Sequence, residues 1–486
     1  MSDGAWQRAF ELVPDGMRVG DTWREAANGS TLAVEDPATL EELARVPDAT
    51  VDDGLAALDA CAAAQVAWAA KAPRERSQLL RAAHEAILAD HEALATLMTA
   101  EMGKPLAQSR GEVSYAADFF LWFSEEAVRV EGRWSVAPSG THHALVVPQP
   151  VGPCLFVTPW NFPLAMGARK LAPALAAGCT TILKPAPQTP LSSLALAGIL
   201  DRVGVPSGVV NVLPTTDAAS VVGALLEDTR LRKLSFTGST AVGKILLRGA
   251  AENVLRTSME LGGNAPFIVC EDADIDAAVD GAELAKLRNM GEACTAANRF
   301  YVHEAVADRF VDAFSERLAS KTVGPGLEPG TDVGPLIDGD AVSKVDRLLD
   351  DAFARGASRV RPPRDVPEVG HFVAPQVLVD VPDDAAMSCE EIFGPVAAIH
   401  RFSDDDEAIA AANDTVHGLV AYVYSRDRAR GRRYVMELEC GMVGLNKGVV
   451  SDPAAPFGGV KQSGIGREGS HEGIEEFLEL KYVAEA

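Results

Sequence analysis

The sequence lacks several features that would place the protein in other functional classes. It lacks an excess of positive charge: the net charge is −25, which argues against nucleic acid and anionic membranes as partners. Every window of 18 residues contains a charged residue or a proline, so no membrane-spanning helix is expected. The N-terminal MSDGAWQRAF has no basic segment followed by an apolar run, so no signal peptide is predicted.

Cysteine spacing excludes a further class. The seven cysteines are odd in number and scattered, with neither CxxC spacing nor histidines nearby. This pattern predicts reduced thiols in a cytoplasmic protein, and no structural zinc or other metal site.

The chain instead has the composition of a globular enzyme, with 47% hydrophobic and 23% charged residues. Its 486 residues exceed what one core can hold, so two large domains and a small third element are expected. Residues 1–50 are predicted to be irregular with short strands. Three helices are predicted to follow at 51–71, 74–101 and 106–131, packed on one face of a sheet.

From Leu155 onward, short apolar strands alternate with helix-length segments at 164–177, 190–203, 217–227 and 240–250. The strands read LFVTP, TTILKP, VVNVL, KLSFTG and APFIVC. This alternation predicts an α/β fold with a doubly wound parallel sheet and a ligand crevice at the strand ends. A second α/β region is predicted from about residue 272, and a projecting hairpin is predicted near 133–147.

Cys294 is the first candidate catalytic residue. It lies in RNMGEACTAAN at 288–298, where Gly291 is predicted to break the preceding helix. A thiol at such a break faces backbone N–H groups that stabilise a thiolate, although most free cysteines are simply buried hydrophobes.

Other candidates follow predicted strands. Glu260 in TSMELGGN is a candidate general base, and Asn161 is a candidate oxyanion donor. Lys184 ends TTILKP and points into the expected crevice. For Glu260 and Lys184 the alternative is a solvated residue at a strand end.

The segment GSTAVGK at 238–244 follows a strand and opens a helix, a geometry that holds phosphate. Its spacing imitates a Walker A loop, but Ile245 stands where that loop needs serine or threonine, so a nucleotide triphosphatase is excluded. Glu391 and Phe393 in EEIFGPV offer a carboxylate for sugar hydroxyls and a ring beside a flat heterocycle.

Taken together, these motifs resemble those of the aldehyde dehydrogenase superfamily in order and spacing, over residues 15–484. The motifs are PWNFPL at 159–164, LKPA at 183–186, FTGST at 236–240, MELGGN at 259–264, EEIFGPV at 390–396 and PFGGVKQSG at 456–464, with the cysteine segment between them. The resemblance implies a Rossmann-type dinucleotide-binding domain (1–131 and 148–258), an α/β catalytic domain (259–440) and an oligomerisation element (132–147 and 470–486) of a homodimer or homotetramer.

The resemblance also assigns roles. Cys294 becomes the nucleophile, Glu260 the general base and Asn161 the oxyanion donor. The residues implied at the dinucleotide site are Trp160, Lys184, Gly238, Ser239, Leu261, Glu391 and Phe393.

Within the superfamily the chain looks most like the succinate-semialdehyde dehydrogenases, through WFSEEAVRVEGR at 122–133, AKLRNMG at 285–291 and the segment at 463–483. That likeness implies a small carboxylated aldehyde held by Arg169, Arg288 and Ser451. A guanidinium matches a carboxylate at two points, which supports the assignment physically. The alternatives are a glutarate semialdehyde, a neutral or cationic aldehyde, or a non-catalytic structural member of the fold.

The sequence departs from the family pattern at three positions. Glu292 stands where glutamine is usual, and Ala296 removes a second cysteine that in some members forms a redox disulfide. Pro187 occupies the position of a glutamate that binds the adenosine ribose in NAD-preferring members. Without that carboxylate a 2′-phosphate is not repelled and Lys184 can attract it, so NADP is favoured over NAD.

Overall fold

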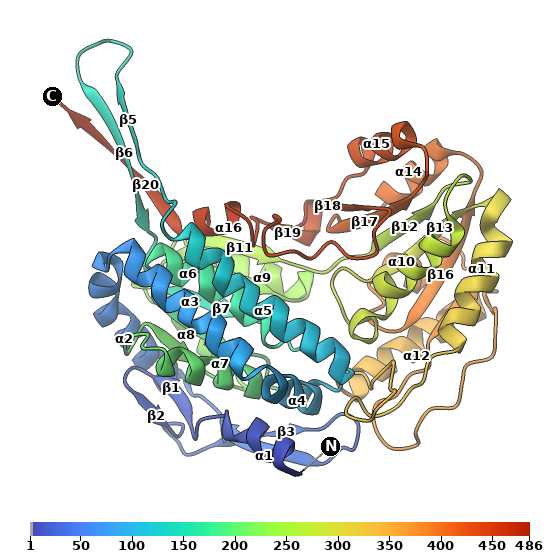
Figure 1. Cartoon of the computed structure of the whole chain (residues 1–486), viewed down its shortest axis with the longest axis horizontal. Helices are drawn as coiled ribbons and strands as arrows, with labels where there is room; N and C mark the ends of the chain where they lie inside the picture. Colours follow the sequence, from blue (N-terminus) through green and yellow to red (C-terminus); the bar gives the residue numbers. More distant parts are fainter. Residues whose placement is uncertain (1–2) are drawn as a thin grey trace.

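A computed structural model describes residues 3–486, and two twisted sheets organise most of that chain (Figure 1). The first sheet has eight strands in the order β19-β11-β10-β7-β8-β9-β1-β2, and the strands from β11 to β9 run parallel. Their bounds are β1 Met17–Val19, β2 Thr22–Arg24, β7 Cys154–Val157, β8 Thr181–Lys184, β9 Val210–Val212, β10 Lys233–Thr237, β11 Arg256–Glu260 and β19 Gly464–Ile465.

Helices cover both faces of this sheet because its side chains alternate. Phe156 and Leu183 belong to a core formed with α3–α7, whereas Leu155 and Ile182 belong to one formed with α2, α8 and α9. The predicted doubly wound sheet is therefore confirmed. These helices are α2 Val51–Ala70, α3 Pro73–Ala89, α4 His91–Met102, α5 Leu106–Glu126, α6 Ala165–Ala177, α7 Leu191–Arg202, α8 Ala218–Glu227 and α9 Thr240–Glu252.

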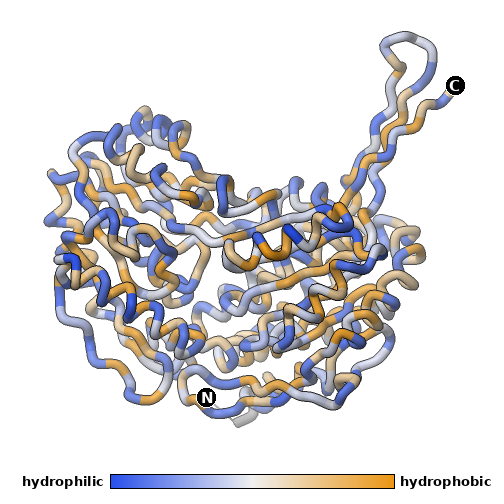
Figure 2. The backbone as a smooth tube through the Cα atoms, turned by 180° about the vertical axis from the view of Figure 1, so that it is seen from behind, coloured by the Kyte–Doolittle hydropathy of each residue, from blue (hydrophilic) through white to orange (hydrophobic). Residues whose placement is uncertain are grey.

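The second sheet has seven strands in the order β14-β15-β16-β13-β12-β17-β18, all parallel except β14. They are β12 Ala265–Val269, β13 Ala297–His303, β14 Ser358–Arg359, β15 Gln376–Val379, β16 Val396–Phe402, β17 Val420–Tyr424 and β18 Met442–Leu445. In Figure 2, hydrophobic residues run through the interior of the molecule and hydrophilic residues are frequent along its outer edge. The associated helices are α10 Ile275–Leu287, α11 Glu304–Ala319, α12 Gly339–Ala354, α13 Ala386–Cys389, α14 Asp405–Asn413 and α15 Arg428–Glu437.

An antiparallel arm projects from the body and carries the C-terminus (Figure 1). Its strands are β5 Arg133–Val136, β6 His143–Pro150 and β20 Leu478–Glu485, in the order β20-β6-β5. The predicted hairpin is thus present, and the C-terminal strand β20 pairs with it. The remaining elements are α1 Asp3–Glu11, β3 Thr31–Glu35, β4 Glu42–Pro47, the short α16 Glu472–Glu475, and the 3-10 turns Arg288–Gly291 and Lys461–Ser463.

Four predictions about elements were wrong. Residues 3–11 form a helix, and the helix predicted at 74–101 is two helices that meet at Asp90. Apolar periodicity continues across Asp90, so it could not show the change of direction. The predicted three-helix layer divides, since α2 packs with α8 on the other face. APFIVC joins the second sheet as β12, because Leu261–Asn264 leads the chain away from β11.

Candidate functional site

Cys294 lies in a loop between α10 and β13, as predicted. The helix ends at Leu287, four residues before the expected break at Gly291, because the chain turns left-handed at three consecutive residues. Asn289 and Met290 have φ of 54° and 55°, and Gly291 has φ of 83°. A Cβ on Gly291 would lie 2.3 Å from the carbonyl oxygen of Gly394, so only glycine fits this turn.

Asn161 is fixed by the backbone of the same loop. Its Nδ2 donates to the carbonyl oxygen of Glu292 at 2.8 Å, and the Nδ2 of Asn289 donates to that same oxygen at 3.0 Å. The carbonyl oxygen of Asn161 accepts from Asn289 Nδ2 at 3.0 Å and from Lys104 Nζ at 2.7 Å. We call Lys104, Asn161, Asn289 and Glu292 the Asn161 network. One N–H of the Asn161 amide is engaged there, which leaves its second available to a ligand.

Glu260 ends β11 and is buried, with 3% of its surface exposed. Its Oε2 has no hydrogen-bond partner within residues 3–486. Burial, and then the negative charge of Glu468, hold the pKa of this carboxyl well above its usual range. A carboxyl of raised pKa with a free oxygen has the properties of a general base.

A cavity of about 250 Å³ brings the three candidate catalytic residues together. Asn161, Glu260 and Cys294 all line it. Burial raises the pKa of the Cys294 thiol to about 12, while the nearby Arg169 and Arg288 guanidinium groups act in the opposite direction. In this state the thiol is protonated, and the two arginines are the groups that favour its thiolate.

Six of the eight candidate cofactor residues line the same cavity, namely Trp160, Gly238, Ser239, Leu261, Glu391 and Phe393. Ser239 caps the N-terminus of α9, where its Oγ accepts from the N–H of Val242. The rings of Trp160 and Phe393 pack edge to face, with their centres 5.5 Å apart. A helix N-terminus, a carboxylate and aromatic walls beside one thiol fit a nicotinamide dinucleotide.

Lys184 and Pro187 do not line this cavity. Lys184 is buried at the end of β8, and no hydrogen bond or ion pair of its ammonium occurs within the part of the chain that the structure describes. Burial lowers the pKa of Lys184 to about 8. A buried, unpaired ammonium is suited to an anionic group such as a phosphate.

Two of the three candidate substrate residues meet in a second cavity of about 520 Å³. Arg288 Nη1 donates to Ser451 Oγ at 2.9 Å, and both residues line the cavity with Phe162. The Arg288 guanidinium lies 4.9 Å from the centre of the Phe162 ring. Arg288 has no ion-pair partner among the described residues, so its charge is free to meet an anion.

Arg169 is placed differently. It is buried on α6, forms an ion pair with Glu468 and stacks on Phe457 with its guanidinium 4.0 Å from the ring centre. It is absent from the lining of the second cavity, although its Nη2 has no hydrogen-bond partner among residues 3–486. The structure therefore does not bring all three candidate substrate residues to one surface.

Sequence reasoning missed several residues of the site. Lys344 on α12 lines the first cavity, and its ammonium lies 5.9 Å from the Phe393 ring centre. Lys104 and Asn289 belong to the Asn161 network, and Tyr115 lines the second cavity. No motif marks Lys344 or Tyr115 in the sequence, whereas Asn289 lies within the RNMG segment already singled out.

Comparisons with known proteins agree with this geometry. The model described as "Aldehyde dehydrogenase family" matches residues 23–483. A succinate-semialdehyde dehydrogenase of Paenarthrobacter nicotinovorans is 53% identical over 91% of this chain and 98% of its own length. A glutarate-semialdehyde dehydrogenase of Pseudomonas putida and an NADP(+) succinate-semialdehyde dehydrogenase of Escherichia coli (strain K12) are each 47% identical, over 96% of both chains.

Solved structures are similar along almost the whole chain. The crystal structure of succinate-semialdehyde dehydrogenase from Burkholderia pseudomallei has a TM-score of 0.96 at 45% identity, covering 98% of each chain. The betaine aldehyde dehydrogenase of Staphylococcus aureus in complex with NAD+ has a TM-score of 0.96 at 32% identity, covering 99% of this chain and 97% of the other.

Proposed function

Because this chain belongs to the aldehyde dehydrogenase family and is an NAD(P)-dependent oxidoreductase, we propose that it oxidises succinic semialdehyde to succinate. The unpaired Arg288 guanidinium, held by Ser451 in the second cavity, carries this proposal. A partly desolvated guanidinium binds a carboxylate more strongly than one in bulk water. It would therefore hold the distal carboxylate while the aldehyde faces Cys294.

The catalytic roles are part of the proposal. The Cys294 thiolate attacks the aldehyde carbon, and the free N–H of Asn161 and the Cys294 N–H stabilise the oxyanion of the thiohemiacetal. When bound, an oxidised nicotinamide dinucleotide would supply the hydride acceptor, and loss of hydride from the thiohemiacetal would leave a thioester on Cys294. Glu260 then takes a proton from water, which hydrolyses the thioester and releases the acid and the thiol. Cys294→Ala should abolish oxidation while cofactor binding is retained.

We further propose that NADP is the preferred cofactor. Lys184 is an unpaired buried cation near Pro187, and no acidic side chain stands at Pro187 to repel a 2′-phosphate. A bound phosphate would stabilise the protonated form of Lys184 against the effect of burial. The NADP(+)-named relative supports this choice, while the NAD+-bound structural neighbour shows that the fold also holds NAD+.

A second candidate substrate is glutarate semialdehyde. The Pseudomonas putida relative carries that name, and the second cavity, at about 520 Å³, has room for the additional methylene. One methylene in an apolar site is worth about 1 kcal/mol, so both dioic semialdehydes would share the Arg288 contact and differ modestly in rate.

We also propose a homodimer or homotetramer assembled through the arm. Leu480 and Tyr482 are 65% and 58% exposed on one face of its sheet, and Trp134 and Val136 are 61% and 56% exposed on the other. Apolar side chains exposed on both faces of a small sheet favour burial by another chain. The described residues include no helix long and apolar enough to cross a membrane. A cytoplasmic location, predicted from the scattered cysteines, completes the proposal.

Initial rates test the substrate and the cofactor together. NADPH and NADH formation would be measured with succinic semialdehyde, glutarate semialdehyde and butanal, a neutral aldehyde of equal length to the first. We expect a large kcat/KM preference for the succinic substrate and for NADP. Equal rates with butanal would overturn the carboxylate pocket, and faster oxidation of glutarate semialdehyde would select the second candidate.

A further inference from the structure

We propose that Tyr115 is a specificity-determining residue whose hydroxyl donates a hydrogen bond to the substrate carboxylate beside Arg288. The inference rests on the proposed function, since it adds a contact to the same site. The observation that carries it is a buried phenol hydroxyl without a partner on the wall of the cavity that contains Arg288 and Ser451.

The position of Tyr115 follows from the helix that carries it. Gln108, Gly111, Glu112 and Tyr115 are spaced by three and four residues on α5, so they share one helix face, and all four line the second cavity. The Tyr115 ring packs edge-on against Phe119, with ring centres 4.9 Å apart. This contact fixes the ring, so the hydroxyl presents a defined direction to a ligand.

The Tyr115 hydroxyl has no hydrogen-bond partner within the described chain, residues 3–486. An unsatisfied buried hydroxyl costs free energy, and native proteins rarely leave one without a reason. In a cavity that also holds a free guanidinium, the simplest reason is that a ligand supplies the missing acceptor.

The surrounding charges define that acceptor. The cationic groups that interact electrostatically with the phenol are Arg169 and Arg288, and the anionic ones are Glu468 and, as a thiolate, Cys294. Burial raises the pKa of Tyr115, so the group stays protonated and acts as a donor. A neutral donor on the wall of the cavity that also holds the Arg288 guanidinium is suited to a carboxylate oxygen. The alkyl end of a neutral aldehyde offers no acceptor at all.

A role at the aldehyde end is the main rival. The groups proposed for the oxyanion, Asn161 and Cys294, line the first cavity, whereas Tyr115 lines the second with Arg288. The two roles differ in their kinetic signature. A contact to the carboxylate affects only carboxylated substrates, while a contact to the oxyanion affects every aldehyde.

The test compares kcat/KM for succinic semialdehyde and butanal in the wild type and in Tyr115→Phe, which keeps the ring. A hydrogen bond to a charged group predicts that the selectivity for succinic semialdehyde falls about 10- to 100-fold, through KM, with butanal unchanged. Succinate should also inhibit the variant more weakly by a similar factor. Trp122→Phe is the matched control: it removes another unpartnered donor on α5, one outside the cavity lining, and should leave the ratio unchanged.

The outcomes separate the two proposals. A wild type without preference for the carboxylated aldehyde would overturn the proposed substrate. A selective wild type whose preference survives in Tyr115→Phe would overturn the role of Tyr115 alone. An equal loss of kcat/KM for both aldehydes would indicate that Tyr115 contacts the oxyanion, and would likewise reject the carboxylate contact.

Discussion

A buried acid lies two residues before the candidate nucleophile. Glu292 is fully buried; its Oε1 accepts from the N–H of Ile337 at 3.2 Å, and its Oε2 is unpartnered among residues 3–486. Burial holds the pKa of this carboxyl well above its usual range, so the side chain is favoured in its neutral form. A neutral carboxylic acid resembles the glutamine that is usual at this position in the family pattern.

Glu292→Gln should therefore preserve activity and stabilise the protein as the pH rises. The unfolded chain loses this proton near pH 4.5, whereas the folded chain holds it to higher pH, so ionisation destabilises the fold above about 4.5. The cost is about 1.4 kcal/mol for each unit between the two pKa values. Unfolding midpoints between pH 5 and 8 should show a growing advantage for the variant.

Glu252→Gln makes the same change at an exposed position and serves as the control. If the advantage of Glu292→Gln stayed constant with pH, the carboxyl would have the same pKa in both states.

Asn289 positions Asn161 and holds a left-handed backbone at the same time. Asn289→Ala and Asn289→Gly both remove the two donated hydrogen bonds, so kcat should fall about 10- to 100-fold in each. Only alanine meets steric strain at a φ of 54°, which costs about 1–2 kcal/mol. The midpoint of thermal unfolding should therefore be lower for Asn289→Ala than for Asn289→Gly. The Kd for the cofactor should change little in both variants. Normal kcat in the glycine variant would show that the amide does not position Asn161.

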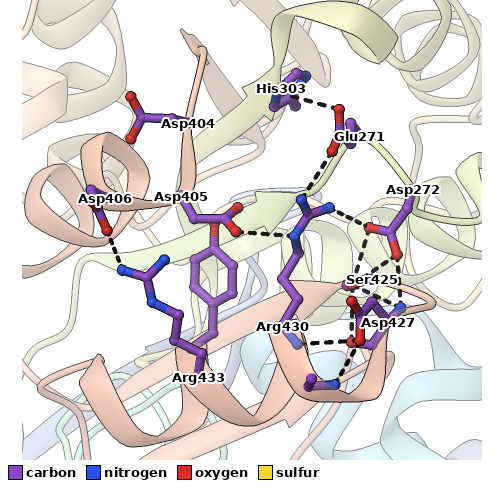
Figure 3. Close-up of polar contacts among 12 residues, drawn as sticks. Glu271, Asp272, His303, Asp404, Asp405, Asp406, Ser425, Asp427, Arg430 and Arg433 are labelled. Atoms are coloured by element: carbon purple, nitrogen blue, oxygen red, sulfur yellow. Dashed lines mark hydrogen bonds and ion pairs between the residues drawn. The ribbon is translucent and has the colours of Figure 1, made fainter.

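At the scale of elements, one arginine joins three segments on the outer face of the second sheet (Figure 3). Arg430 on α15 pairs with Glu271 at 2.9 Å and Asp272 at 3.1 Å, just after β12, and with Asp405 at 3.0 Å, where α14 begins. The figure shows its guanidinium between these carboxylates. The network fixes α14 and α15 to the strand ends, and none of its four residues lines either cavity of the candidate site.

Arg430→Met should destabilise the protein by about 2 kcal/mol, between the values for exposed and buried ion pairs, because it leaves three carboxylates together. Activity at 25 °C should remain near that of the wild type. Arg428→Met, on the same helix and exposed, is the control. Chemical denaturation measures the free energy of unfolding of both variants. A loss as small as that of the control would mean that the network adds nothing to stability.

At the scale of the whole molecule, the arm is the element that the single chain leaves uncovered. Leu480→Asp with Tyr482→Asp should shift the mass in solution from a multiple of 51.3 kDa toward one chain, since charges replace the apolar face. Light scattering during gel filtration measures this. Val66→Asp, at an exposed apolar site outside the arm, should leave the mass unchanged. An unaltered mass in the double variant would place the interface elsewhere.

Much of the molecule followed from the sequence alone. The alternation of strands and helices predicted a doubly wound sheet, and Asn161 follows one parallel strand of that sheet, β7, while Glu260 ends another, β11, as expected. Such features depend on residues a few positions apart, whose periodicity and turn residues the sequence displays directly. The family motifs then singled out Cys294 and most of the residues that line the first cavity.

Only the tertiary structure decided which sheet APFIVC joins and that Arg169 pairs with Glu468. It also decided that, within residues 3–486, Arg288 has no ion-pair partner and the Tyr115 hydroxyl has no hydrogen-bond partner beside the second cavity. An ion pair or an unsatisfied donor depends on groups that come from distant parts of the chain and on the water they lose when they meet. Local sequence patterns carry no record of those neighbours, so the substrate side of the site was determined by packing.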